Sequence, residues 1–197
     1  MLEFWLFILR LMRTGELRKM GLRKASAYSK MRVLPFTRTS RSKAKSYIKV
    51  VPHSKIAKYT SGNHTDFSEG KHKYSVKLIS EQKVLVRDNA LESTRMLLTK
   101  LLDENVPGQY YLRVMVHPHH FLRENKTAAG AGADRVSTGM TEAYGVVIGR
   151  AAIVKPNETI AVVTCTDEDT ARKIKDLMPA VKAKIPAKTK IVFEKLG

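Results

Sequence analysis

The stretch DNALESTRMLLTKLLDENVPGQYYLRVMVH, residues 88–117, decides the fold of this chain, because a helical pattern is followed directly by a strand pattern. Apolar residues recur at helical spacing over residues 90–102, which predicts a helix with one buried face. Asn, Val, Pro and Gly at 105–108 end that helix. Residues 110–117 then alternate between two faces and predict a strand.

Two helices are predicted in the chain, each with its own start signal. Asp88 and Asn89 followed by Glu92 predict a capping box for the first helix. Thr166 with Asp169 predicts the cap of the second, and Pro179 is expected to kink or interrupt that helix.

The remaining pattern of residues 71–197 is that of a globular domain. Residues 74–79 and 189–193 predict strands, and residues 151–154 and 159–165 predict a hairpin. A long loop is expected at about residues 118–142. The order predicts an α+β fold, a two-layer sandwich in which two helices cover one face of a mostly antiparallel sheet.

Residues 20–70 predict a basic, irregular arm. No Asp or Glu occurs over residues 17–65, and residues 1–62 carry 15 Lys and Arg against 2 Asp and Glu, whereas residues 63–197 carry 21 against 16. Such a run repels itself when free and becomes favourable beside a polyanion, where it releases condensed counterions. The arm therefore predicts a nucleic-acid partner, on whose bases Tyr28, Phe36 and Tyr47 can stack.

The segment His117-Pro118-His119-His120, with Glu124 nearby, has some of the donors of a metal site. It lacks a second cluster, and its neighbours Arg113, Arg123 and Lys126 are basic. We therefore assign no metal, and expect a polar role facing RNA or a packing role.

The Gly-rich stretch at residues 130–135, GAGADR, ends in Arg where a dinucleotide-binding fingerprint needs Gly, and it has no βαβ context. It predicts either a loop that approaches nucleic acid closely or an ordinary surface loop. Cys165 lies in an apolar strand and predicts a buried, inert thiol. No nucleophile and base can be paired from spacing, so we expect neither an enzyme nor a cofactor.

Five stretches together resemble a known family: residues 20–30 (MGLRKASAYSK), 47–56 (YIKVVPHSKI), 87–92 (RDNALE), 117–126 (HPHHFLRENK) and 130–140 (GAGADRVSTGM). They are similar to an archaeal large-subunit ribosomal protein family, the one numbered sixteenth in bacteria and tenth in eukaryotes. The resemblance covers about residues 20–197.

The resemblance implies a structural protein of the large subunit in the cytoplasmic ribosome. It implies large-subunit rRNA near the peptidyl-transferase centre, A-site tRNA and neighbouring ribosomal proteins as partners, with no membrane and no homo-oligomer. A non-ribosomal protein that binds nucleic acid nonspecifically is the alternative, and an RNA-modifying enzyme built on the His segment ranks below both.

The basic arm and the His segment supply the predicted rRNA contacts, and the Gly-rich loop the contacts near tRNA. The rRNA residues are Arg23, Lys24, Lys30, Arg32, Arg38, Arg41, Lys43, Lys45, Lys49, Arg113, His117, His119, His120 and Arg123. The residues near tRNA are Asn125, Lys126, Gly130, Gly132 and Arg135.

The chain departs from the family in two places. Residues 1–19 have no counterpart in it, so we expect them to be a non-native or disordered extension and translation to start at Met20. Residues 141–150 replace a basic segment containing Gly and Pro, and Tyr144 and Arg150 are left to supply contacts to RNA there.

Overall fold

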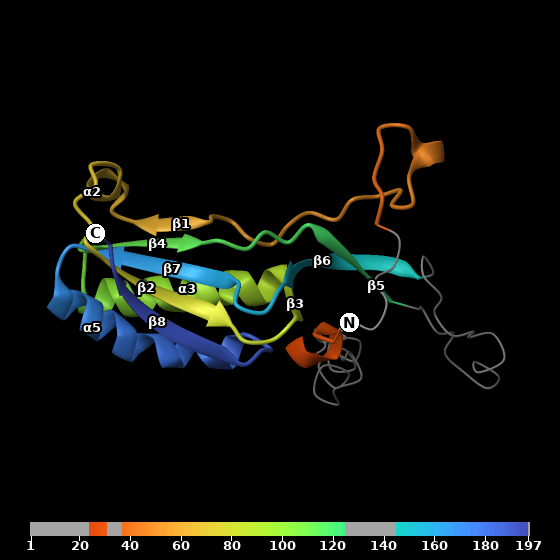
Figure 1. The fold of residues 1–197 in the computed structure, drawn as a ribbon. Helices are drawn as coiled ribbons and strands as arrows, with labels where there is room; N and C mark the ends of the chain where they lie inside the picture. The colour runs from red at the N-terminus through yellow and green to blue at the C-terminus, as the bar shows by residue number, and fades with distance from the viewer. Residues whose placement is uncertain (1–23, 31–36, 125–144, 197) are drawn as a thin grey trace, which may run out of the picture.

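The computed structural model describes residues 24–30, 37–124 and 145–196 (Figure 1). Two sheets and the helices beside them make up the described part. In chain order the elements are η1 (Ala25–Tyr28), η2 (Lys43–Lys45), β1 (Thr60–Gly62), α2 (His64–Ser68), β2 (Tyr74–Ser80), β3 (Val84–Arg87), α3 (Asp88–Asn105), β4 (Tyr110–Val114), β5 (His120–Glu124), β6 (Val146–Val154), β7 (Thr159–Cys165), α5 (Glu168–Leu177), η3 (Met178–Lys184) and β8 (Thr189–Lys195).

The larger sheet has five antiparallel strands in the order β1-β4-β7-β2-β8. Helices α3 and α5 lie on the same side of this sheet, as Figure 1 shows. The core between the layers takes Val76 and Leu78 from β2, Leu112 from β4, Leu98 from α3 and Ile174 from α5, each at most 1% exposed. The predicted α+β sandwich with a mostly antiparallel sheet is confirmed.

The two predicted helices are present, but their caps differ from the prediction. Arg87 and Asp167 occupy the N-cap positions, and neither side chain makes a capping hydrogen bond. Glu92 does not complete a capping box, because its carboxylate is held by Arg95 and by the backbone of Ala57. Pro179 acts as expected, since α5 ends at Leu177 and the chain continues as the 3-10 helix η3.

A second, three-stranded antiparallel sheet with the order β3-β6-β5 extends beyond the first one (Figure 1). This sheet was not predicted from the sequence: the strand expected over residues 110–117 ends at Val114, and β5 lies inside the predicted loop. Strand β5 was not predicted because one Pro and three His residues at 117–120 interrupt the apolar alternation there. Strand β6 begins at Val146, five residues before the predicted hairpin strand, and its first five residues are exposed or half-buried.

The last residues of the predicted arm join the domain. Strand β1 pairs with β4, with Thr60 opposite Arg113, and α2 follows with Asn63 as its N-cap, accepting from Thr65 N and Asp66 N. Gly62 has φ +91°, and a Cβ at this position would lie 2.3 Å from the carbonyl oxygen of Tyr110. A glycine is therefore required where the arm turns out of the sheet.

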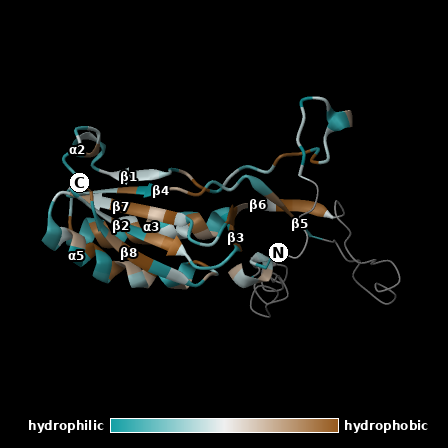
Figure 2. Ribbon diagram, in the orientation of Figure 1, coloured by the Kyte–Doolittle hydropathy of each residue, from teal (hydrophilic) through white to brown (hydrophobic). Residues whose placement is uncertain are grey.

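Hydropathy follows this layering. Figure 2 shows hydrophobic residues on the strands of both sheets, whereas the loop formed by residues 38–49 is largely hydrophilic. Among the described residues no helix is both long and apolar enough to cross a membrane.

Candidate nucleic-acid interface

The first described segment of the arm packs on the small sheet. The ring of Tyr28 joins the apolar cluster of Leu85, Leu122 and Ala151. Its hydroxyl donates to the Glu124 carboxylate at 3.0 Å, and the Arg87 guanidinium lies 5.3 Å from the ring centroid. An aromatic side chain of the arm, predicted to stack on bases, is thus used here to attach the arm to the protein.

Residues 38–49 form a closed loop that projects from the small sheet (Figure 1). Its base is held by Tyr47 N and Ile48 N, which both donate to the Arg38 carbonyl at 3.0 and 3.2 Å. The Arg38 guanidinium also lies 4.8 Å from the centroid of the Tyr47 ring. Ile48 is 2% exposed. The cationic side chains between the two ends of the loop are exposed.

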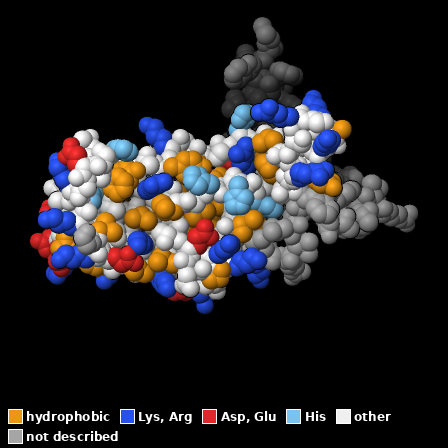
Figure 3. All heavy atoms as spheres, turned by 45° about the horizontal axis from the view of Figure 1, so that its top comes forward, with side chains coloured by type: hydrophobic (Ala, Val, Ile, Leu, Met, Phe, Trp, Pro, Cys, Tyr) orange, Lys and Arg blue, Asp and Glu red, His pale blue; other side chains and the backbone are white. Residues whose placement is uncertain are grey.

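We call this closed loop, residues 38–49, the basic loop. Arg41, Lys43 and Lys45 at its tip are exposed, and η2 is the single 3-10 turn that carries the two lysines. The Lys49 ammonium donates to the Lys43 carbonyl, which keeps that cation beside the others. Figure 3 shows the resulting concentration of Lys and Arg side chains at the upper right.

Arg123, at the end of β5, connects three parts of the chain. It donates from Nη2 to the Tyr47 carbonyl and from Nη1 to the Gly145 carbonyl, each at 3.1 Å. Tyr47 belongs to the basic loop, and Gly145 is the first described residue after residue 124. The guanidinium therefore holds the basic loop beside Gly145, which follows the segment 125–144 in the chain.

Farther along, the arm is held mainly through its backbone. Arg150 donates from Nε to the Pro52 carbonyl at 2.6 Å, and its guanidinium lies 5.7 Å from the centroid of the Phe121 ring. The buried Asp88 carboxylate accepts from Lys55 N at 3.0 Å. Glu92 accepts from Ala57 N at 3.3 Å. Two carboxylates of α3 thus bind backbone N–H groups of the arm.

The His segment does not form one site. The exposed ring of His117 lies 4.4 Å from that of Tyr59, and His119 Nδ1 lies 2.9 Å from the His117 carbonyl oxygen. His120 is 4% exposed, and burial lowers its pKa, with a smaller contribution from His119. Of the two roles expected for the His segment, burial favours packing over an RNA contact for His120. Within the described ranges no group of three or more His, Cys, Asp or Glu could hold a metal ion.

Apart from His120 and Arg123, whose positions are given above, the predicted site residues fall into three sets. Exposed on the arm or at the His segment are Lys24, Lys30, Arg38, Arg41, Lys43, Lys45, Lys49, His117 and His119. Arg113 is also exposed, but it lies in β4 on the face of the large sheet away from the helices, since its neighbours Leu112 and Val114 are buried in the core. Outside the described residues are Arg23, Arg32, Asn125, Lys126, Gly130, Gly132 and Arg135.

Catalytic chemistry finds no support in the one thiol of the chain. Cys165 is 0% exposed, and burial, with a smaller effect of Asp167, raises its pKa to about 11. A thiol with such a pKa is protonated at neutral pH and is a poor nucleophile. The predicted burial of Cys165 is confirmed.

Three residues that organise the site were not predicted as such: Tyr28, Asp88 and Arg150. Asp88 was expected to cap a helix and Arg150 to contact RNA, whereas both hold arm backbone. No sequence signal marks these contacts, because Asp88 and Arg150 bind backbone groups that every residue possesses.

Comparison with known proteins gives one consistent result. A family model described as "Ribosomal protein L16p/L10e" matches residues 35–192. The chain is 37% identical to the large ribosomal subunit protein uL16 of Staphylothermus marinus over 179 residues, which is 90% of this chain and 96% of that protein. It is 35% identical over 178 residues to uL16 of Methanococcus aeolicus, covering 89% and 96% of the two chains. It is 36% identical over 179 residues to uL16 of Pyrobaculum calidifontis, covering 90% and 97%.

Proposed function

This chain belongs to the ribosomal protein L16p/L10e family, and from that premise we propose that it binds large-subunit rRNA near the peptidyl-transferase centre and helps to position A-site tRNA. It is a structural constituent of the large ribosomal subunit and not an enzyme. Its partners are accordingly rRNA and other ribosomal proteins.

The basic loop carries the rRNA part of the proposal. The arm attaches to the domain through the Tyr28 side chain and through backbone groups of Ser29, Tyr47, Pro52, Lys55 and Ala57. The ion pairs found among the described residues all lie between residues 66 and 194. The arm is therefore positioned while its cationic side chains stay available for phosphates, as binding to a polyanion requires.

The tRNA part of the proposal rests on the place of the segment 125–144. Arg123 and Gly145, the described residues that flank this segment, are joined to each other and to Tyr47 of the basic loop. The segment is therefore connected to the domain next to the proposed rRNA surface, which suits a role in reaching a second RNA. Lys126 and Arg135 would supply cations there, as the family resemblance implies.

Binding of the full-length chain to a large-subunit rRNA transcript, measured at increasing salt, tests the rRNA contacts. Replacing Arg41, Lys43 and Lys45 together by Ala should reduce the slope of log K against log salt by about 2, since each lost phosphate contact removes about 0.7. The matched control replaces Arg172, Lys173 and Lys175, exposed cations of α5, by Ala. An equal change in both variants, or equally tight binding of duplex DNA by the unaltered chain, would favour nonspecific nucleic-acid binding instead.

A further inference from the structure

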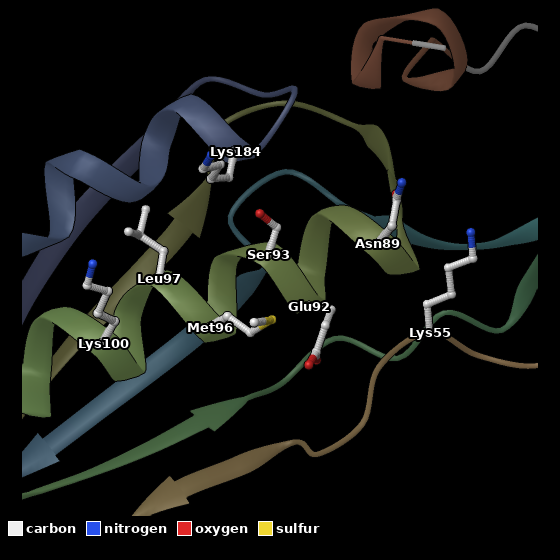
Figure 4. A pocket seen from close by; sticks show the side chains of 8 residues that line it. All are labelled: Lys55, Asn89, Glu92, Ser93, Met96, Leu97, Lys100 and Lys184. Carbon is white, nitrogen blue, oxygen red and sulfur yellow. The ribbon is translucent and has the colours of Figure 1, made fainter. Parts of the chain in front are cut away.

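An open groove of about 480 Å³ runs along α3 (Figure 4). Lys55 of the arm and Lys184 of η3 border it, so three separate parts of the chain contribute to its walls. Its volume is within the range of about 300 to 1,000 Å³ that is usual for binding pockets. The lining residues are Lys55, Asn89, Glu92, Ser93, Met96, Leu97, Lys100 and Lys184.

The floor of this groove is apolar. Met96 is 59% exposed, whereas the apolar residues on the other face of α3, Leu91 and Leu98, are 1% exposed. Leu97 beside it is half-buried. A flexible methionine left open to solvent in a groove is suited to contact with apolar side chains of varied shape.

The rim of the groove is positive. Lys55, Lys100 and Lys184 are exposed and surround the α3 segment in Figure 4. The Glu92 carboxylate is already occupied by two hydrogen bonds from Arg95, at 3.0 and 2.5 Å. Glu104 lies 3.9 Å from the Lys100 ammonium, but both side chains are largely exposed and the pair is screened by solvent. The groove therefore attracts negative charge.

We propose that this groove binds an acidic peptide segment of a partner protein, which places an apolar side chain against Met96 and carboxylates against Lys100 and Lys184. Single-stranded RNA is the less suitable occupant, because RNA sites of this kind use aromatic side chains for stacking and none lines the groove. This surface is separate from the basic loop and goes beyond the rRNA and tRNA contacts proposed above.

The test uses the full-length chain labelled with ¹³C at the methionine methyl groups. The probe is an acetylated peptide of alternating acidic residues that contains one Leu and one Phe, and the control peptide has Ser at those two places. The Met96 resonance is identified by its loss in Met96→Gln. We expect the Leu/Phe peptide to shift this resonance saturably and to bind about tenfold more tightly than the Ser peptide, as burial of one large apolar side chain implies.

Two internal references make the result specific. Met115, 44% exposed and outside the groove, should not shift, and Met178, 0% exposed, should keep its resonance in every variant as a check of folding. Replacing Lys100 and Lys184 by Ala should weaken binding at least tenfold. Replacing Lys173 and Lys175 on α5 by Ala removes the same charge and should leave binding unchanged.

Equal binding of the two peptides, a Met115 shift as large as that of Met96, or equal weakening by the two lysine pairs would overturn the proposal in favour of general attraction to a basic protein. A single-stranded RNA that shifts Met96 when neither peptide does would overturn it in favour of an RNA surface.

Discussion

The guanidinium of Arg123 donates to the backbone carbonyl of Tyr47, which lies 76 residues earlier in the chain, at 3.1 Å. The same side chain donates to the Gly145 carbonyl. One side chain therefore holds both the basic loop, through Tyr47, and Gly145, which follows the segment 125–144 in the chain. A substitution at Arg123 should affect both.

Arg123→Ala should release the basic loop. Hydrogen bonds from a charged donor contribute about 1.5–3 kcal/mol each, and this partly exposed pair should cost about 1–3 kcal/mol in total. Because the lost contacts lie outside the main core, the effect should be local: trypsin should cleave faster at Arg41, Lys43 and Lys45, and the main unfolding transition should change little. Limited proteolysis followed by mass spectrometry measures this. Arg113→Ala, at an exposed cation of β4, is the control, and equally fast cleavage in that variant would contradict the assigned role.

Gly62→Ala should destabilise the chain more than Gly70→Ala. Both glycines have positive φ, +91° and +72°, so both substitutions carry a backbone cost of about 1–2 kcal/mol. At Gly62 the new Cβ would additionally meet the Tyr110 carbonyl oxygen, whereas at Gly70 nothing lies within 4 Å. Urea unfolding of the two variants gives the difference in the free energy of unfolding. Equal losses of free energy of unfolding in the two variants would show that the close approach of Gly62 to the Tyr110 carbonyl oxygen does not contribute to stability.

Some helices and strands could be predicted from the sequence and others could not. Helices α3 and α5 and strands β2, β7 and β8 were found because their apolar residues repeat locally. Strand β1, Thr60–Gly62, was not predicted, because it is short and only its pairing with β4, with Ser61 opposite Leu112, makes it a strand. Strand β5 was missed because Pro118 and the His residues interrupt the apolar pattern.

The candidate site was predictable in its charge and not in its contacts. The cations of the basic loop are visible in the sequence, because charge is a property of each residue. Arg123 and Arg150 bind backbone carbonyls, which every residue possesses, so no residue type marks Tyr47 or Pro52 as their partners. His120 was assigned to RNA with its neighbours, and only the fold shows that it points inward.

Stability should fall as the pH is lowered through the range in which free histidine titrates. Burial lowers the pKa of both His72 and His120 below the usual 6.5, and His72 keeps a hydrogen-bond contact of 2.8 Å with Thr164. Below pH of about 6.5 the unfolded chain therefore binds more protons than the folded one, and the free energy of unfolding decreases with decreasing pH. Thermal unfolding between pH 8 and 5 should show this decrease.

The matched variants for this prediction are His120→Gln and His119→Gln. His120→Gln should reduce the dependence on pH, even if it lowers stability overall, because one buried titrating group is gone. His119→Gln removes an exposed imidazole and should leave most of the dependence in place. A profile that is unaffected by His120→Gln would assign the decrease to other groups.

Lys126→Ala should weaken translation more than it weakens assembly of the large subunit. Lys126 lies two residues beyond β5, in the segment 125–144 that Gly145 follows, and the family resemblance directs this segment toward A-site tRNA. Loss of one cation facing a tRNA phosphate should lower tRNA affinity while the basic loop still attaches the protein to rRNA. Purified large subunits carrying the variant should contain the protein at full stoichiometry, and A-site tRNA binding should be reduced severalfold. Lys188→Ala, at an exposed lysine just before β8, is the control. Normal tRNA binding with defective assembly would instead place Lys126 among the rRNA contacts.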